Sequence, residues 1–334
     1  MNIFELLNDR YFLSDKPKLF EAFSGIGCQL MAFKRLGVEV GSVGFSEIDK
    51  YAIQSYNAIH GDTKNFGSIC DIKGTDLPQI DVFTWSFPCT DLSKAGKQKG
   101  LTNTRSGLVY EVLRIMQECK VNANLPKVLI MENVVDLVQV KFIREFQEIQ
   151  LELEELGYSN YTQTLNAKDY GVAQNRDRVF MVSILGDYYY EFPQPIKLEK
   201  EMKDYLETFV DKIYWVSKGL LNAFMQPGTG KYPRRERFLQ NIDRVNQKIA
   251  NAITTIPGNR PTDNFVKVDD KDCETKLRKL TELECWRLMG IDDKDFYKAK
   301  KGISKAQLYK QAGNGIVVDV FVAILKTMIK GDTK

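Results

Sequence analysis

The sequence has very little histidine, since His60 is the only one in 334 residues. A metal site built on histidines is therefore nearly excluded, and chemistry that needs a histidine base has one candidate. The six cysteines form no CxxC pair, so neither a zinc site nor a disulfide framework is indicated. No apolar run approaches the ~20 residues that span a bilayer. The first residues carry acidic side chains, unlike a signal peptide. We therefore expect a cytoplasmic protein without metal or membrane contact.

Charge is unevenly distributed along the chain. The net charge is only +3, and 43% hydrophobic with 27% charged residues is typical of a globular protein. Residues 212–250, however, hold eight basic side chains against two acidic ones. Residues 94–105 hold four basic side chains and no acidic one. Each segment alone reads as a solvated loop, but together they indicate two sides of a cleft that binds a polyanion.

The first half of the chain alternates short apolar runs with helical patterns. Strands are predicted at Lys18–Phe23, Val38–Phe45, Asp81–Trp85, Lys127–Met131 and Arg178–Leu185, and helices up to Arg35 and over Asp49–Ile59, Gly107–Glu118 and Leu137–Leu156. This alternation predicts an α/β fold with a doubly wound, mostly parallel, Rossmann-like sheet. Ligands of such sheets bind outside the carboxyl ends of the strands.

The alternation stops near Gly186, where tyrosines and scattered prolines replace it. We predict a first domain over 1–186, a smaller second domain over 187–277, a hinge over 278–304, and a C-terminal helix over 305–334 that completes the first domain. Within the hinge, Thr281 followed by Glu284 has the spacing of a capping box at the start of a helix.

Cys89 follows the apolar run Asp81–Trp85 and the pair Phe87-Pro88, at the end of a predicted buried strand. A thiolate in that position could act as a nucleophile. An inert buried cysteine is the alternative, and we assign that packing role to the other five cysteines. We expect His60 to lie on the surface at a helix end.

The turn Phe23-Ser24-Gly25-Ile26-Gly27 follows the first predicted strand. Glycine has no Cβ and tolerates positive φ, so a ligand can approach the backbone closely there. The helix that follows offers unpaired N–H groups to an anion. Glu47, at the end of the next strand, could accept both hydroxyls of a ribose, or could simply stabilise a helix N-terminus. Asp71 could accept from an adenine amino group or be an ordinary loop residue.

Seven segments of the chain together resemble a known family. They are FEAFSGIGCQLMAF, GFSEID, DVFTWSFPCTDLS, LIMENV, AQNRDRVFMV, RKLTELECWRLMGI and QAGNGIVV. Their order and spacing are similar to the signature blocks of DNA (cytosine-5) methyltransferases. The resemblance covers about 17–186 and 278–325. The part outside it, 187–277, is where that family carries its target-recognition domain.

The resemblance implies a catalytic role for four residues. Cys89 would add to carbon 6 of a cytosine that is flipped out of the duplex, because carbon 5 is a poor nucleophile. Glu132 would hold the N3 and amino edge of the base, and Arg178 with Arg176 would stabilise negative charge on the O2 side. The product is 5-methylcytosine.

The resemblance also implies S-adenosylmethionine as methyl donor, with S-adenosylhomocysteine as product. The cofactor-binding residues would be Phe23, Ser24, Gly25, Gly27, Glu47, Ile48, Asp71, Pro88 and Asn314. The partner would be double-stranded DNA, contacted by Ser93, Lys97, Arg105, Arg234, Arg235 and Arg237. We expect a monomer from a restriction–modification system or a phage, with a cognate restriction endonuclease acting separately on the same site.

The chain departs from the family pattern at three positions and leaves three alternatives. Thr90 stands where glutamine is common, Cys28 where a third glycine is common, and Gly315 where serine is frequent. A tRNA cytosine-5 methyltransferase would share the catalytic blocks, but its Cys-Phe-Thr tripeptide is absent here. A non-catalytic DNA-binding relative would be expected to lose Cys89 or Glu132. A dinucleotide oxidoreductase is the weakest alternative, because the full GxGxxG spacing is missing.

Overall fold

The computed structural model describes residues 9–88, 105–226, 234–242, 246 and 248–330. The chain divides into two compact units. Unit 1 comprises residues 1–165, 177–194 and 321–334, and unit 2 comprises 166–176 and 195–320. The domain boundaries predicted from the sequence are functional ones, and they stay a prediction.

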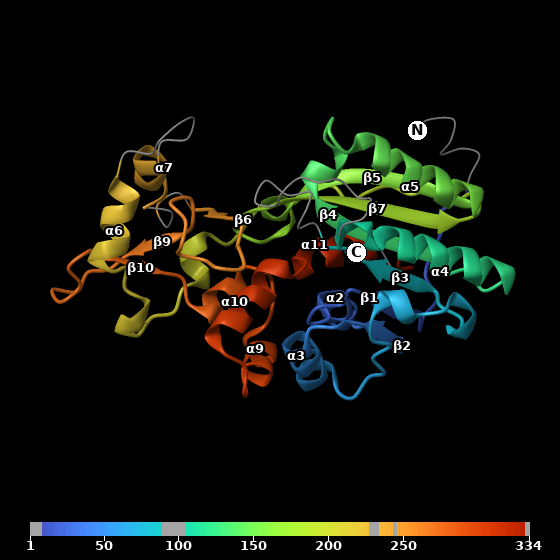
Figure 1. The fold of residues 1–334 in the computed structure, drawn as a ribbon, viewed down its shortest axis with the longest axis horizontal. Coiled ribbons are helices and arrows are strands. Elements are labelled where there is room, and N and C mark those ends of the chain that lie inside the picture. Colours follow the sequence, from blue (N-terminus) through green and yellow to red (C-terminus); the bar gives the residue numbers. More distant parts are fainter. Residues whose placement is uncertain (1–8, 89–104, 227–233, 243–245, 247, 331–334) are drawn as a thin grey trace. The chain divides into compact units, whose positions relative to one another are not determined.

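Unit 1 is built on a six-stranded sheet with the strand order β2-β1-β3-β4-β7-β5 (Figure 1). The strands are β1 (Lys18–Ala22), β2 (Gly41–Ser46), β3 (Val82–Trp85), β4 (Val128–Val134), β5 (Tyr158–Asn166) and β7 (Asp177–Leu185). Strands β2, β1, β3 and β4 pair in parallel, whereas β7 runs antiparallel to β4. The predicted mostly parallel α/β sheet is confirmed. The strand β5 was not predicted.

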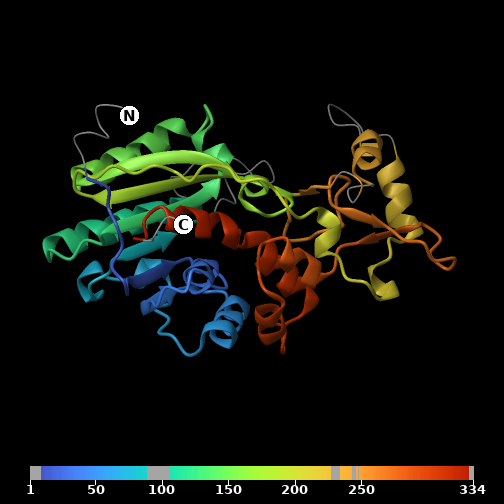
Figure 2. The same cartoon turned by 180° about the vertical axis from the view of Figure 1, so that it is seen from behind.

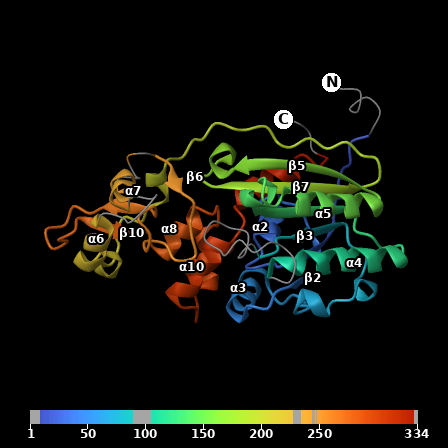
Figure 3. The ribbon, with the colours of Figure 1, turned by 45° about the horizontal axis from the view of Figure 1, so that its top comes forward.

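Helices cover both faces of this sheet, as the alternation of strands and helices requires. In unit 1 they are α2 (Cys28–Arg35), α3 (Lys50–His60), α4 (Val109–Val121), α5 (Ile143–Glu155) and the end of α11 (Val318–Lys326). Figure 3 shows α4 and α5 on one side of the sheet, and Figure 2, seen from behind, shows the end of α11 (red) on the other. Short 3-10 helices connect them at Ile69–Asp71, Gly74–Asp76, Arg105–Leu108 and Val135–Val138.

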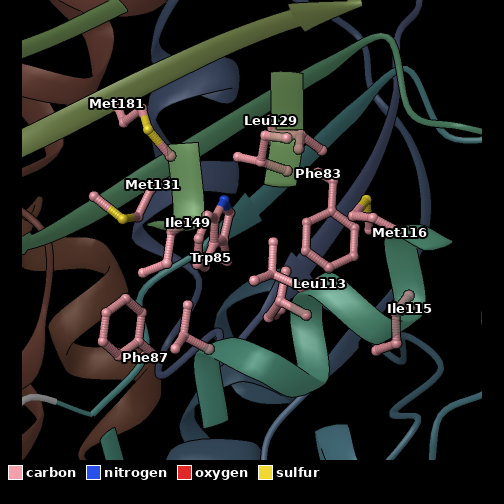
Figure 4. Packing of buried hydrophobic residues seen from close by; sticks show 14 of the residues in the cluster. Phe83, Trp85, Phe87, Leu113, Ile115, Met116, Leu129, Met131, Ile149 and Met181 are labelled. Atoms are coloured by element: carbon pink, nitrogen blue, oxygen red, sulfur yellow. The ribbon is translucent and has the colours of Figure 1, made fainter. Parts of the chain in front are cut away.

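The core between the sheet and the α4–α5 layer reaches the end of β3. Alternate strand residues such as Phe83 and Trp85 point into it, because successive side chains of a strand face opposite sides. Leu113 and Met116 of α4 pack against them (Figure 4). Phe87, two residues beyond β3, is buried in the same cluster and stacks with Trp85 at 5.9 Å between ring centroids. The segment that leads into Cys89 is thus tied to the core.

Unit 2 contains short elements around a small apolar core. Its strands are β6 (Gln174–Asn175), β8 (Ala250–Asn251), β9 (Phe265–Lys267) and β10 (Leu277–Lys279), with β6 parallel to β8 and β9 antiparallel to β10. Its helices are α6 (Lys218–Met225), α7 (Arg234–Asn241), α8 (Glu282–Arg287), α9 (Asp293–Ala299) and α10 (Lys305–Asn314), with 3-10 turns at Ala167–Tyr170, Met202–Tyr205 and Lys212–Tyr214. Val216, Phe224, Phe238, Phe265 and Leu277 form the small core. The capping box at Thr281 and Glu284 is confirmed.

The stretch Lys305–Lys326, which includes α10 and α11, is the one part of the described chain long and apolar enough to cross a membrane. Its most apolar window is 61% buried within the protein. Core helices of soluble proteins meet the same length and composition test, so this stretch is weak evidence for membrane contact.

Candidate active site

A buried carboxylate lies where β4 approaches its carboxyl end. Glu132 is only 7% exposed. Its Oε1 is 3.1 Å from Nε of Arg178, and its Oε2 accepts a hydrogen bond of 2.6 Å from the Ser86 hydroxyl. Antiparallel pairing places Arg178 opposite Val134, two residues from Glu132, so that the two charged side chains lie diagonally across adjacent strands. A buried charge needs such partners. The guanidinium and the hydroxyl therefore hold the carboxylate in one orientation.

The chain segment before Cys89 is fixed from the same strand. The Asn133 side chain donates a 3.2 Å hydrogen bond to the Phe87 carbonyl, and the Ser86 hydroxyl also donates to the Glu132 carbonyl at 2.9 Å. Adjacent residues of β4 thus hold both Ser86 and Phe87. Cys89 itself lies outside the described residues, as do Ser93 and Lys97. Pro88, the last residue described there, is half-buried.

The turn between β1 and α2 has an unusual backbone. Phe23, Gly25 and Gly27 have φ of 55°, 57° and 78°, in the left-handed region. That region is strained for a phenylalanine and needs support from the surrounding structure. A Cβ on Gly25 would meet no atom of the described residues within 4 Å, so their arrangement leaves this side of the turn open to a ligand. The buried Ser24 hydroxyl has no hydrogen-bond partner among the described residues.

The predicted ribose and adenine residues stand beside this turn. Glu47 follows β2, and its carboxylate accepts from the backbone N–H groups of Gly25 at 3.0 Å and of Ile48 and Asp49 at 2.8 Å. A carboxylate has about four acceptor sites, so one remains for a hydroxyl. Ile48 is 76% exposed, unusual for an isoleucine beside a strand end. Asp71 is exposed at the end of a 3-10 turn. These features fit an adenosyl group. They are the open side of the turn at Gly25, the Ser24 hydroxyl, the Glu47 carboxylate and the exposed Ile48 side chain.

The Arg176 side chain is buried and donates to backbone carbonyls, and its expected place on the O2 side of the base stays a prediction. It is 4% exposed and belongs to unit 2, where its guanidinium donates to the carbonyls of Ile253 at 2.9 Å and of Gly313 and Gly315 at 3.0 Å. Three backbone carbonyls therefore occupy two of its nitrogens. Two of these carbonyls flank Asn314, which is exposed at the end of α10.

Two of the predicted DNA-contacting arginines can be placed. Arg235 and Arg237 are exposed on α7, and Phe238 of the same helix is buried in the small core of unit 2. Arg234 opens the same helix, and Arg105 opens the 3-10 turn before α4. Their contact with DNA phosphates, which arginine and lysine most often bind in DNA, stays a prediction.

Comparison with known proteins agrees with this geometry. The family model of the C-5 cytosine-specific DNA methylase matches residues 18–330. The chain belongs to this family. It is similar to the type II methyltransferase M2.ScrFI of Lactococcus lactis subsp. cremoris, with 31% identity over 94% of this chain and 99% of the relative. It is also similar to the type II methyltransferase M.NlaX of Neisseria lactamica, with 32% identity over 93% and 96%.

The fold of this C-5 cytosine DNA methylase also matches solved structures. The Dnmt2 methyltransferase of S. pombe superposes with a TM-score of 0.74 at 20% identity, covering 94% of this chain and 98% of that one. At that identity the likeness shows the fold alone. Fold and family together establish a DNA (cytosine-5) methyltransferase.

Sequence reasoning missed three residues near the site. Ser86 and Asn133 hold Glu132 and Phe87, and the only signal was their position next to these residues. His60 was predicted on the surface, but it is half-buried and its Nε2 is 3.0 Å from the Ile26 carbonyl. Of the cysteines assigned to packing, Cys28, Cys119, Cys273 and Cys285 are buried, whereas Cys70 is exposed. The described residues contain no cluster of His, Cys, Asp and Glu that could hold a metal.

Proposed function

We propose that this methyltransferase modifies a cytosine by covalent catalysis through Cys89, within a specific duplex sequence. The Glu132 cluster carries the proposal, because it combines a buried carboxylate, a guanidinium and an anchored Phe87-Pro88 segment that leads into Cys89. The base must leave the stack to reach such a buried carboxylate, at a cost of a few kcal/mol.

The proposed reaction begins at the thiolate. Cys89 sulfur forms a bond to carbon 6, and the electrons of the C5–C6 double bond move to carbon 5. Glu132 holds the N3 and amino edge of the ring, and Arg178 lies beside it to stabilise charge on O2. S-adenosylmethionine, when bound, would supply the electrophilic methyl group, with S-adenosylhomocysteine as the other product. Carbon 5 takes the methyl group and then loses its proton to water, the C5–C6 double bond re-forms, and the S–C6 electron pair leaves with Cys89 as thiolate.

The cofactor would lie at the turn Phe23–Gly27. The open side of Gly25, the Ser24 hydroxyl and the Glu47 carboxylate support this placement, with Ile48 against the adenine. Asp71, Pro88 and Asn314 complete the proposed set. These residues bind and orient the donor, and the chain itself contributes the nucleophile.

DNA would be contacted by Ser93, Lys97, Arg105, Arg234, Arg235 and Arg237. Residues 187–277 would read the target sequence. We further propose that the enzyme acts as a cytoplasmic monomer that protects DNA against a separate endonuclease. The relatives named type II methyltransferases support the separate endonuclease, whereas the orphan methyltransferase of Bacillus phage SPbeta supports the alternative, protection of phage DNA.

The test is bisulfite sequencing of plasmid DNA from cells that express the wild type, Cys89→Ser or Cys70→Ser. Cys70 is an exposed cysteine of the same unit and serves as the matched control. We expect one methylated sequence motif with the wild type and Cys70→Ser, and none with Cys89→Ser. Methylation by the Cys89→Ser protein would exclude Cys89 as the nucleophile. An unmethylated plasmid from cells that express the wild type would exclude DNA methylation as the activity. Salt-sensitive DNA binding without methylation would indicate a binding protein instead.

A further inference from the structure

The start of helix α2 lacks the usual means of satisfying its backbone. Its N-cap is Gly27, which has no side chain to accept from the first N–H groups. The Leu30 N–H donates instead to the Glu21 carboxyl of β1, at 3.2 Å. The carbonyl of Ile26, just before the helix, therefore needs a partner from elsewhere, because Ile26 is 2% exposed and an unpaired buried carbonyl is destabilising.

His60, the last residue of α3, is that partner. Its Nε2 lies 3.0 Å from the Ile26 oxygen, and its Nδ1 lies 3.0 Å from the ammonium of Lys34. An ammonium can only donate, so Nδ1 accepts and the proton of the neutral ring is on Nε2. The Nε2–H group therefore donates to the carbonyl between the two left-handed glycines of the turn.

His60 also packs directly against the turn. A Cβ on Gly27 would lie 2.5 Å from His60 Nε2 and 2.7 Å from Tyr56 Cε2. Tyr56 and His60 are four residues apart on α3, which places both rings on one helix face, 4.6 Å apart. The turn thus has two unlike sides, since Gly27 is backed by α3 while Gly25 is open.

We propose that His60 is a positioning residue for S-adenosylmethionine. Its hydrogen bond and ring hold the Ile26 peptide in the orientation that keeps Gly25 and Ser24 turned toward the cofactor. This inference rests on the cofactor site proposed above. It assigns to His60 no contact with the reacting atoms, so its loss weakens cofactor binding and leaves the chemical step intact.

Three substitutions test the hydrogen bond separately from the bulk of the side chain. His60→Leu removes the donor, whereas His60→Gln keeps an N–H donor at a similar reach from the backbone. His60→Asn keeps the same polar group on a side chain one carbon shorter. The measurements are the Kd of S-adenosylhomocysteine by calorimetry, KM and kcat for S-adenosylmethionine, and the Kd of duplex DNA.

We expect His60→Leu and His60→Asn to raise the Kd of S-adenosylhomocysteine and the KM of S-adenosylmethionine by about tenfold, as the loss of one buried hydrogen bond implies. His60→Gln should restore most of the affinity. The kcat at saturating cofactor and the DNA affinity should stay within about twofold of the wild type. If the His60→Leu protein fails to fold, the comparison of His60→Asn with His60→Gln still tests the proposal.

Equal cofactor affinity of Asn, Gln and wild type would overturn the proposal, as would a fall in kcat without a change in cofactor Kd. These results are distinguishable from failure of the proposed function. In that case the wild type itself would bind no S-adenosylhomocysteine.

Discussion

Glu21 is a carboxyl group buried beneath the cofactor turn, and it makes stability depend on pH. It is 0% exposed on β1, accepts from the Tyr56 hydroxyl at 2.6 Å and from the Leu30 N–H. Burial raises its pKa from 4.5 to about 7, although these two hydrogen bonds and the nearby Lys34 oppose the shift. Because the folded pKa is raised, the protonated form favours folding. The stability that Glu21 contributes is complete below pH 4.5 and is lost as the pH rises through 7.

The substitution Glu21→Gln should remove this dependence, because the amide stays neutral. At 1.36 kcal/mol per pKa unit, the wild type loses about 3 kcal/mol by pH 8, and most of that loss falls between pH 5 and pH 8. The amide oxygen can accept only one of the two present hydrogen bonds well, so the variant starts with a constant penalty of about 1 kcal/mol. We therefore expect Glu21→Gln to be similar to or less stable than the wild type at pH 5, and more stable at pH 8.

The assay is urea unfolding of both proteins at pH 5, 6.5 and 8, with the difference in free energy taken at each pH. Other titrating groups cancel in that difference. A difference for Glu21→Gln that is constant across the range would refute the reasoning, since it would mean that Glu21 titrates alike in the folded and unfolded chain.

Three further substitutions test the site and unit 2. Ser86→Ala should lower kcat by about tenfold and leave the KM of the cofactor unchanged, because the Glu132 carboxylate loses its hydroxyl partner; unchanged kcat in a steady-state assay would contradict this. Arg278→Met should reduce the urea stability of unit 2 by about 3–5 kcal/mol, since Glu284 would be left buried without its two 2.8 Å contacts. The half-exposed pair of Arg287 and Asp293 is the control, and Arg287→Met should cost only about 1 kcal/mol. Gly313→Ala should prevent α10 from packing, because its Cβ would lie 2.4 Å from the Thr255 nitrogen. The control is Gly219→Ala in α6, whose Cβ meets no described atom within 4 Å and which should be neutral or stabilising. Thermal melting followed by circular dichroism compares the two variants with the wild type.

Strands β3 and β4 could be predicted because they are buried along almost their whole length and read as mostly apolar runs. The strand β5 escaped prediction because its sequence, YSNYTQTLN, is largely polar at the edge of the sheet. The helix expected over Leu137–Leu156 is interrupted between a 3-10 turn and α5, where Gln139 and Lys141 break the apolar pattern.

At the site, residue type and block order gave Glu132 and Arg178, which the structure brings together. Contacts that depend on the pairing of distant segments could not be predicted. The role of His60 requires knowing that the end of α3 meets the turn after β1, and the partners of Arg176 come from three carbonyls more than 70 residues away along the chain. The direction of a strand within the sheet could not be predicted from the sequence either, and it is the antiparallel course of β7 that places Arg178 near Glu132.

Unit 2 is made of two separate stretches of the chain, and this limits how the enzyme can be re-engineered. Unit 2 takes residues 166–176 from the middle of the catalytic signature blocks, and their strand β6 pairs with β8. The Gln174 side chain accepts from the Ile253 N–H at 2.8 Å, and Arg176 donates to the Ile253 carbonyl. A chimera that exchanges all of residues 195–320 would leave residues 166–176 without these hydrogen-bond partners. Any exchange within the proposed target-recognition region, 187–277, would therefore have to retain Ala250–Ile253.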